Sequence, residues 1–366
     1  MNDAGEKRSE ARREAALRAN VVGLGLIGGS IALGLRANGW VVTGDDIEDG
    51  RGDVALARGI VDHTGLDPDA DITFVAVPVL AAADQVAQAL KATSGAVTDV
   101  GSVKSAVCAS IDDERFVGGH PMAGSELDGL AGADADLFSG AVWVLTPTEV
   151  TSHRALAVVS RAVRELGAEM VAMPPDRHDA MVAVVSHVPH LTAASLMGIA
   201  ADGAEEHAAL LRLAAGGFRD MTRIASGQPD IWLDICEQNR PSILTALDRL
   251  LDALVEMRDV VEAADRDGLL QRLQRARVAR SNLPSRITRP EQVAEVRIPI
   301  PDRPGAAAEI FTIAARESIN IASFEVVHLA ESNLGVAVVL VDADAADRYR
   351  TVLAANGYHP GLSPLT

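Results

Sequence analysis

Short apolar runs alternate with alanine-rich stretches from residue 19 to residue 149. Each run is rich in valine, leucine or isoleucine, and glycine, aspartate or proline follows it, which is typical of buried strands. We predict strands in the segments NVVGLG, WVVTGDD, ITFVAVP, AVTDVG, RFVGGHP and AVWVLTP. Strands that alternate with helices form βαβ units around a parallel sheet, so this pattern predicts an α/β domain.

The pattern changes near residue 150 and stays changed to residue 282. Leucine and alanine recur there at three- and four-residue spacing, as in SILTALDRLLDALVEMRDVVEAA. This periodicity is typical of amphipathic helices, and strand signals nearly vanish. We predict an all-α domain whose long helices bury more than one apolar face, which favours a homodimer.

The two ends of the chain form separate segments. Residues 1–18 carry charges of both signs without an apolar core, so they are interpreted as a polar tail and not as a signal peptide. Residues 283–293 are rich in proline and polar side chains and are interpreted as a linker. In residues 294–366 the order strand, helix, strand, strand, helix, short strand predicts a ferredoxin-like βαββαβ unit, with the last strand at YHP.

Composition narrows the class of partner. The net charge of −18 disfavours nucleic acid, whose phosphates attract basic surfaces. No unbroken apolar run reaches the roughly 18 residues of a membrane span. The two cysteines are too few for a disulfide framework, which fits a cytoplasmic location. We expect no metal site, because several histidines show no ligand-type spacing with carboxylates or cysteines: His63, His153, His178, His207 and His328.

A glycine-rich turn follows the first predicted strand. Gly23, Gly25 and Gly28 form the pattern G-x-G-x-x-G, and a helix is predicted to begin there. Such a turn places a pyrophosphate on the free N–H groups of the helix N-terminus, which predicts a dinucleotide-binding Rossmann domain. A plain strand–helix turn is the alternative. Four further residues are assigned to the cofactor site: Leu26 and Ile27, and Val77 and Pro78 after the third predicted strand.

Two acidic residues end the second predicted strand. Asp45 and Asp46 lie 22 and 23 residues after Gly23, near the spacing of the acid that binds a ribose 2′-hydroxyl. A carboxylate there repels a 2′-phosphate, so NAD is favoured over NADP, although Arg51 lies close. The sequence leaves open which of the two acids contacts ribose, and a solvated turn is the alternative for both.

His120 stands in the stretch RFVGGHPMAGSELDG. Glycine allows another group to approach the backbone closely, and Pro121 favours an extended conformation at His120. We predict a rigid loop that presents an imidazole to a ligand. A structural loop histidine is the alternative.

Four motifs, in this order, resemble the prephenate dehydrogenase family, which includes arogenate dehydrogenases. The resemblance covers about residues 20–282 and rests on D-V-G-S-V-K at 99–104, G-G-H-P-M-A-G at 118–124, S-H-V-P-H at 186–190 and T-R-I-A at 222–225. It implies NAD-dependent oxidative decarboxylation of prephenate to 4-hydroxyphenylpyruvate, in tyrosine biosynthesis.

The resemblance also implies residue roles. His120 is similar to the catalytic histidine that takes the proton of the C4 hydroxyl, and Ser102 to the serine that hydrogen-bonds this histidine. Arg223 is similar to the arginine that binds the ring carboxylate, and His190 to a second histidine of the substrate site. His187 and Glu126 are further substrate-site candidates, with helix packing and a surface acid as their respective alternatives.

The C-terminal segment looks like an ACT domain, an amino-acid-sensing module, because it contains PDRPG and INIASFEVV. In similar modules the corresponding loops bind an amino acid between paired units, which implies tyrosine or phenylalanine as an effector. The candidate residues are Asp302, Gly305, Asn320 and Ile321. A purely structural dimerisation module is the alternative.

Three other functions stay open at this point. Arogenate differs from prephenate in carrying an ammonium group in place of a keto group, and no acid can be assigned to that end from the sequence. The second is another oxidoreductase with a Rossmann domain and a helical domain, such as an imine reductase. The G-G-H-P and T-R-I-A motifs of this sequence argue against it. A non-enzymatic amino-acid or redox sensor on the same fold is the third.

Overall fold

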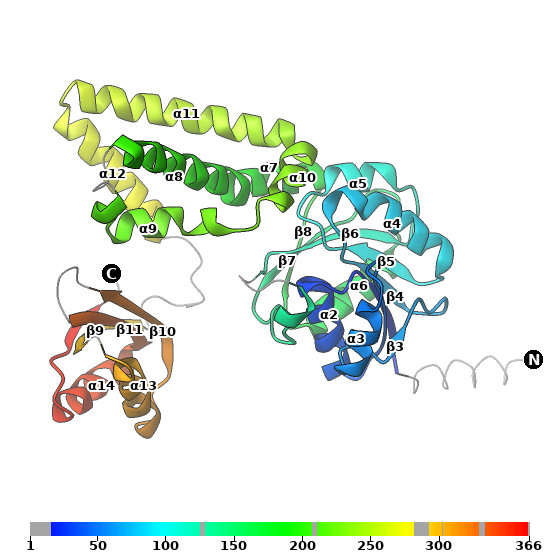
Figure 1. Cartoon of the computed structure of the whole chain (residues 1–366), viewed down its shortest axis with the longest axis horizontal. Helices are drawn as coiled ribbons and strands as arrows, with labels where there is room; N and C mark the ends of the chain where they lie inside the picture. The colour runs from blue at the N-terminus through cyan, green and yellow to red at the C-terminus, as the bar shows by residue number, and fades with distance from the viewer. Residues whose placement is uncertain are drawn as a thin grey trace, which may run out of the picture. The chain divides into compact units, whose positions relative to one another are not determined.

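The computed structural model describes residues 16–124, 129–206, 211–281, 293–301, 303–328 and 334–364 (Figure 1). Most of the predicted tail (1–18) and of the predicted linker (283–293) lies outside these ranges. The chain divides into two compact units, of which the first comprises residues 1–199 and 222–256 and the second residues 200–221 and 257–366.

An eight-stranded sheet with helices on its faces forms the N-terminal part of the first unit (Figure 1). The strand order is β3-β2-β1-β4-β5-β6-β7-β8. Its strands are β1 (Arg18–Val22), β2 (Val41–Asp45), β3 (His63–Thr64), β4 (Ile72–Val75), β5 (Ala96–Asp99), β6 (Phe116–Pro121), β7 (Val142–Thr146) and β8 (Glu169–Ala172). Its helices are α2 (Leu26–Ala37), α3 (Arg51–Ala57), α4 (Val79–Ala92), α5 (Ser105–Ser110) and α6 (His153–Glu165). The predicted Rossmann-like domain is confirmed.

The central strands read as almost continuous apolar runs because helices cover both faces of the sheet. Val21 of β1, Val42 of β2 and Phe74 of β4 have no exposed surface, and Ile31 and Leu35 of α2 pack into the same core. This packing holds the strand ends, and therefore the loops after them, in fixed positions.

The sheet differs from the prediction in three respects. It continues past residue 149, because α6 and β8 add a further parallel strand beside β7. Strands β3 and β8 were not predicted, since both are short edge strands whose side chains are exposed or half-buried, which leaves little apolar signal. The β6–β7 pair is antiparallel. The connection between these two strands has no crossover helix, only the short turn Leu130–Gly132 among its described residues.

Helices make up most of the described residues between 175 and 281, and no strand lies among them, which confirms the predicted all-α domain. They are α7 (Pro175–Val182), a π-helical turn (Ala183–His187), α8 (Val188–Glu206), α9 (Gly216–Thr222), α10 (Asp230–Gln238), α11 (Arg240–Glu262) and α12 (Arg266–Ser281). In the first unit, Ala183, Val188, Ile235 and Ile243 pack against Val103, which follows β5. This cluster fixes the start of the helical domain against the sheet.

One helical run, residues 175–203, is long and apolar enough to cross a membrane by length and composition, with 28% of its most apolar window buried. A single run of this kind is weak support for a membrane span, since a helix of a water-soluble core passes the same test. The sequence shows no unbroken apolar stretch here, because the run carries His178, Asp179, His187 and His190.

The C-terminal part has the predicted βαββαβ order: β9 (Val293–Pro301), α13 (Ala306–Arg316), β10 (Ile321–His328), β11 (Leu334–Asp342), α14 (Ala343–Ala355) and β12 (Gly361–Pro364). Its strands form an antiparallel sheet in the order β10-β11-β9-β12. The core contains Val296, Ile310, Val339 and Tyr349. The last strand lies at residues 361–364 and not at YHP, because Tyr358 still belongs to the turn that ends α14.

Candidate active site

The glycine turn between β1 and α2 has the geometry of an anion-binding site. Gly23 has a φ of +90°, which favours glycine, and a Cβ at Gly28 would overlap the Gly23 carbonyl oxygen. A Cβ at Gly25 would meet nothing within 4 Å, so the space beside it is open to a ligand. No side chain caps α2, and the free N–H groups of its first turn, from Leu26 and Ile27, can therefore receive a pyrophosphate.

Asp46 joins the second strand to this turn. Its Oδ2 accepts a hydrogen bond of 2.7 Å from the backbone N–H of Leu24, and its Oδ1 accepts one of 2.8 Å from Glu48. Arg51 lies between Asp46 and Glu48 and forms an ion pair with each. In the sequence, Arg51 made the preference for NAD over NADP less certain. In the structure its guanidinium is already paired with two carboxylates.

A pocket of about 170 Å³ lies beside this acid. Its lining contains five carboxylates, those of Asp45, Asp46, Glu48, Asp49 and Asp53, together with glycines and Thr64. A phosphate group would be repelled here, whereas the hydroxyls of an unmodified ribose can donate to carboxylate oxygens. The electrostatics of the pocket therefore favour NAD.

The other candidate residues follow neighbouring parallel strands. Val77 follows β4 and lies next to Gly23, and Pro78 occupies the N-cap position of α4. Ser102 follows β5, and His120 lies near the end of β6. Because β1, β4, β5 and β6 are adjacent and parallel, their carboxyl ends meet at one edge of the sheet, where ligands bind in open α/β folds.

His120 belongs to strand β6 and not to a loop. It pairs with Val144 of β7, and Pro121 pairs with Trp143. The glycines before it do not serve the approach of a ligand, as the sequence suggested, because protein atoms already fill that space. A Cβ at Gly119 would lie 2.7 Å from the Asp99 carbonyl oxygen, and one at Gly118 would collide with the Thr146 hydroxyl.

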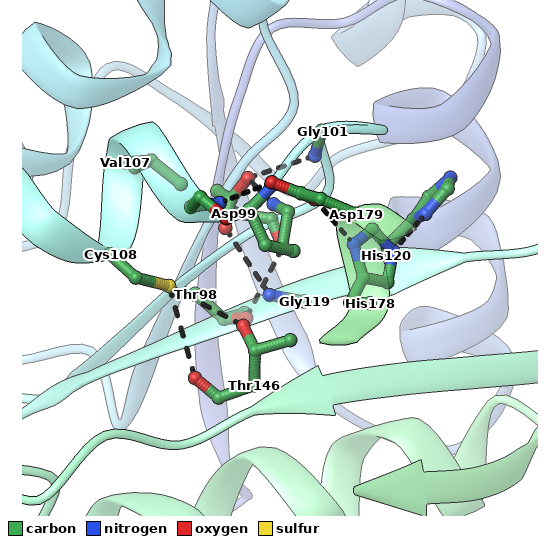
Figure 2. Close-up of polar contacts among 12 residues, drawn as sticks. Thr98, Asp99, Gly101, Val107, Cys108, Gly119, His120, Thr146, His178 and Asp179 are labelled. Atoms are coloured by element: carbon green, nitrogen blue, oxygen red, sulfur yellow. Dashed lines mark hydrogen bonds and ion pairs between the residues drawn. The ribbon is translucent and has the colours of Figure 1, made fainter. Parts of the chain in front are cut away.

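A buried ion pair between Lys104 and Asp99 lies next to strand β6. Lys104 Nζ contacts Asp99 Oδ2, and neither side chain has exposed surface. Asp99 also accepts hydrogen bonds from the backbone N–H groups of Gly101, at 2.9 Å, and Gly119, at 3.2 Å (Figure 2). The pair therefore links the loop of Ser102 to the strand of His120, and Lys104 faces neither solvent nor an open cofactor site.

His120 is hydrogen-bonded to a second histidine. Its Nδ1 lies 2.8 Å from Nε2 of His178, and Nδ1 of His178 lies 2.8 Å from Oδ1 of Asp179 (Figure 2). His178 and Asp179 are both buried, on helix α7. The expected hydrogen bond from Ser102 to His120 is absent: the Ser102 hydroxyl is buried and has no partner among the residues that the structure describes.

The surroundings of His120 keep its imidazole neutral at neutral pH. Loss of solvation lowers its pKa well below 6.5, and the nearby His178, Lys104 and His187 lower it further, against the opposing charge of Asp179. A neutral imidazole has a free lone pair on one ring nitrogen. His120 can therefore accept a proton from a bound alcohol.

Two more histidines line the start of α8. His187 is buried, and its Nδ1 lies 3.1 Å from the Asn239 side-chain amide. Burial lowers the pKa of His187 to about 4. His190 is half-buried and stacks on Trp232, with ring centroids 3.6 Å apart. Desolvation also lowers the pKa of His190. His187 and His190 together form a neutral, aromatic surface, the histidine wall.

Arg223 begins the short turn Arg223–Ser226, and its side chain is exposed. The turn ends beside the histidine wall, because a Cβ at Gly227 would lie 3.8 Å from Cε1 of His190. Glu126 lies outside the described residues. Of the predicted substrate-site residues, the structure therefore places His187 and His190 together and the Arg223 turn next to them.

Sequence reasoning missed His178 and Asp179. His178 was set aside because it shows no ligand-type spacing with carboxylates or cysteines, and Asp179 was not singled out. A signal was nevertheless present: His178 and Asp179 are adjacent and directly precede the apolar run AMVAVV that leads into S-H-V-P-H. Among the described residues, no group of three or more histidine, cysteine or acidic side chains is arranged to hold a metal ion.

Comparisons with known proteins agree with this geometry. The model of the prephenate dehydrogenase nucleotide-binding domain matches residues 31–172, and that of the prephenate dehydrogenase dimerization domain matches residues 174–275. The first of these matches also extends past residue 149, as the sheet does.

Individual relatives point the same way. Prephenate dehydrogenase of Bacillus subtilis is 34% identical over 341 residues, which are 88% of this chain and 92% of that protein. Among solved structures, prephenate dehydrogenase of A. aeolicus with hydroxyphenyl propionate and NAD+ has a TM-score of 0.69 and 29% identity, and covers 74% of this chain and 99% of its own. Arogenate dehydrogenase of Synechocystis has a TM-score of 0.66 and 31% identity, over 73% and 100%. The chain belongs to the prephenate dehydrogenase family and is an NAD-dependent oxidoreductase.

Proposed function

We propose that this enzyme converts prephenate to 4-hydroxyphenylpyruvate with NAD as the oxidant, and that His120 is the base. The observation that supports this most is the neutral imidazole of His120 at the edge of the sheet where the glycine turn also lies. When bound at the glycine turn, NAD would supply the acceptor for the hydride at C4 of the ring. The C4 hydroxyl proton moves to His120. The C1 carboxylate then leaves as carbon dioxide, its bonding electrons complete the aromatic ring, and the phenolate oxygen takes a proton back from the imidazolium of His120.

Ser102 and the histidine wall are assigned to substrate binding. The Ser102 hydroxyl is buried and has no partner in the described part of the chain, and such a group costs free energy unless a ligand or water satisfies it. His190 and its stacked partner Trp232 offer an aromatic surface to the substrate ring. Arg223 supplies a guanidinium that matches a carboxylate in two hydrogen bonds. Glu126 and His187 stay predictions for the same site.

The cofactor assignments follow the same edge. Leu26, Ile27, Val77 and Pro78 border the glycine turn. Asp46 is assigned to the ribose, because it already lies against the turn through Leu24. Asp45 contributes charge to the pocket without this contact.

Arogenate is the second candidate substrate, favoured by the similarity to the Synechocystis enzyme. Both substrates can be assayed side by side, each with NAD and with NADP, by following the absorbance of the reduced cofactor. We expect prephenate with NAD to give the highest kcat/KM. Turnover of neither substrate would contradict the proposed function, and preference for arogenate would replace prephenate by its amino analogue.

The helical domain is proposed to form a homodimer in the cytoplasm. Large apolar side chains are exposed along its helices: Ile199, Leu244, Leu251, Leu254, Val255, Leu270 and Leu273. Large apolar side chains exposed in this number are typical of subunit interfaces, and the matching family model describes a dimerization domain. Light scattering behind a sizing column should give twice the chain mass of 38.3 kDa.

The C-terminal βαββαβ part, residues 293–364, is proposed to be an ACT domain that binds tyrosine or phenylalanine. Its βαββαβ order and antiparallel sheet support this assignment. Gly305 has a φ of +89°, and a Cβ there would meet nothing within 4 Å, so the turn before α13 is open to a ligand. Asn320 is exposed and Ile321 half-buried at the start of β10. Asp302 lies outside the described residues.

Calorimetric titration of the full chain with each amino acid tests this assignment. Binding of one of them together with altered kcat or KM would support feedback. A matched truncation after residue 282 should lose the response. Identical responses of both forms, or no binding by the full chain, would leave only a structural role for the unit.

A further inference from the structure

His120, His178 and Asp179 form a continuous hydrogen-bonded row. The two links, from Asp179 Oδ1 to His178 Nδ1 and from His178 Nε2 to His120 Nδ1, are each 2.8 Å long. The two members behind His120 are buried, with 1% of His178 and 2% of Asp179 exposed. Only His120 belongs to the strand edge where the substrate is proposed to bind, so the row runs from the protein interior to the reacting site (Figure 2).

Asp179 is ionised. Burial raises its pKa, but hydrogen bonds from His178 and from the backbone N–H groups of Lys104 and Ser105 lower it more, so it lies below the ordinary value. The two backbone donors lie 2.8 Å from Oδ1 and Oδ2. An ionised carboxylate can only accept hydrogen bonds. The proton in the link to His178 is therefore on Nδ1 of His178.

The tautomers of both histidines follow from this. A neutral His178 with its proton on Nδ1 has a bare Nε2, which can only accept. The proton in the next link must then be on Nδ1 of His120. A neutral His120 protonated on Nδ1 has a bare Nε2, which is the atom that can take a proton from an alcohol.

We propose that His178 and Asp179 are positioning residues that hold His120 in the tautomer with a bare Nε2 and stabilise the imidazolium that forms when Nε2 takes the hydroxyl proton. The base role of His120 rests on the proposed function, whereas the tautomer does not. Asp179 acts behind the two rings as the buried aspartate acts behind the histidine of a serine-protease triad. The other titratable groups that act on His120 are Lys104 and His187.

The row also accounts for how a proton can be accepted in a buried site. An imidazolium at His120 would otherwise face Lys104, whose charge opposes it. With the row in place, the new charge on His120 donates through Nδ1 to His178, and the carboxylate of Asp179 lies behind that ring. No atom other than the hydroxyl proton has to move in this step.

His178 is the residue to change, because Asp179 also holds the backbone of Lys104 and Ser105. His178→Phe keeps a planar ring and removes the acceptor for His120. His178→Gln offers a side-chain oxygen near the position of Nε2 and can restore it. His153→Gln, an exposed change on α6, is the control.

We expect His178→Phe to lower kcat for prephenate by about 10²-fold or more, with the dissociation constant of NAD and the unfolding temperature close to those of the control. The loss should persist from pH 6 to pH 9, because the ratio of the two neutral tautomers does not depend on pH. His178→Gln should recover most of the lost kcat. A kcat of His178→Phe within threefold of the wild-type value would overturn the proposal.

Nitrogen NMR of histidine-labelled enzyme reads the protonated ring nitrogens without any substrate. His120→Asn identifies the His120 signals among the nine histidines. The wild-type enzyme at pH 8 should carry the His120 proton on Nδ1, and His178→Phe should shift it toward Nε2. A wild-type His120 protonated on Nε2 would overturn the proposal even if prephenate is turned over. If neither prephenate nor arogenate is turned over, the proposed function is wrong, but the NMR measurement still determines the tautomer of His120.

Discussion

Lys104 and Asp99 form an ion pair in which neither side chain has any exposed surface. Removal of one member of a buried pair leaves an uncompensated charge, which costs about 3–5 kcal/mol. Lys104→Met should therefore lower the free energy of unfolding by this amount in denaturant titration. Lys91→Met, on the exposed end of α4, should change it by less than about 0.5 kcal/mol. Equal effects of the two substitutions would mean that the pair adds no stability.

His120→Asn should leave the fold and NAD binding intact, because the side chain stays polar and small. We expect kcat to fall by about 10²–10⁴-fold, which is the usual contribution of a general base. Steady-state kinetics with prephenate, together with NAD binding by fluorescence, measures both quantities. A kcat within a few-fold of the wild-type value would assign the base to another group.

Arg223→Ala should chiefly raise KM for prephenate. It removes a charge-assisted contact to a carboxylate that is present in both the ground state and the transition state. The expected loss is roughly 1.5–3 kcal/mol in kcat/KM. Arg219→Ala is the matched control, since Arg219 is an exposed arginine on α9 that donates to the Ala214 carbonyl oxygen. An unchanged KM with lower thermal stability would make Arg223 a structural residue instead.

Asp46→Ser should weaken the discrimination against NADP. The substitution removes the carboxylate that lies against the glycine turn and leaves Arg51 with one acidic partner fewer. Asp45→Ser removes the same charge without that contact and should have the smaller effect. The ratio of kcat/KM for NAD and NADP measures each change, and a reversed order would assign the ribose to Asp45.

The stability of the fold should decrease between pH 6.5 and pH 4 through His187. Its pKa is about 4 in the folded chain, below the ordinary value of 6.5. In that window the unfolded state binds more protons, so the contribution of neutral His187 is complete above pH 6.5 and is lost as the pH falls toward 4. The full loss is roughly 3 kcal/mol.

His187→Gln isolates this contribution. A glutamine cannot be protonated in this range, so the variant should lose less stability than the wild-type enzyme when urea unfolding is compared at pH 7 and pH 4.5. Burial of the His187 side chain removes solvation from its charged form, which explains why the neutral form is preferred. Parallel stability curves of the two proteins would show that His187 does not titrate on unfolding.

Local sequence determined most of the sheet and the glycine turn. Runs such as ITFVAVP become strands because helices bury both faces, and Gly23 and Gly28 are required by backbone geometry within a few residues of the chain. The edge strands β3 and β8 were not predicted because their side chains are exposed or half-buried. His120 was found because its motif is local, and the predicted strand RFVGGHP contained it. The antiparallel pairing of this strand with β7 was not predicted, since it is a long-range contact.

The partner of His120 was decided by the tertiary structure alone. His178 lies 58 residues further along the chain, on helix α7, which is held in place by hydrogen bonds from the backbone of Lys104 and Ser105 to Asp179. The same holds for Lys104, whose burial follows from the fold around Asp99. Motifs record which residue types a reaction needs, because chemistry fixes them. The protonated nitrogen of His120 is set by its hydrogen-bonded row with His178 and Asp179. This row forms only when segments that are distant in the sequence pack together.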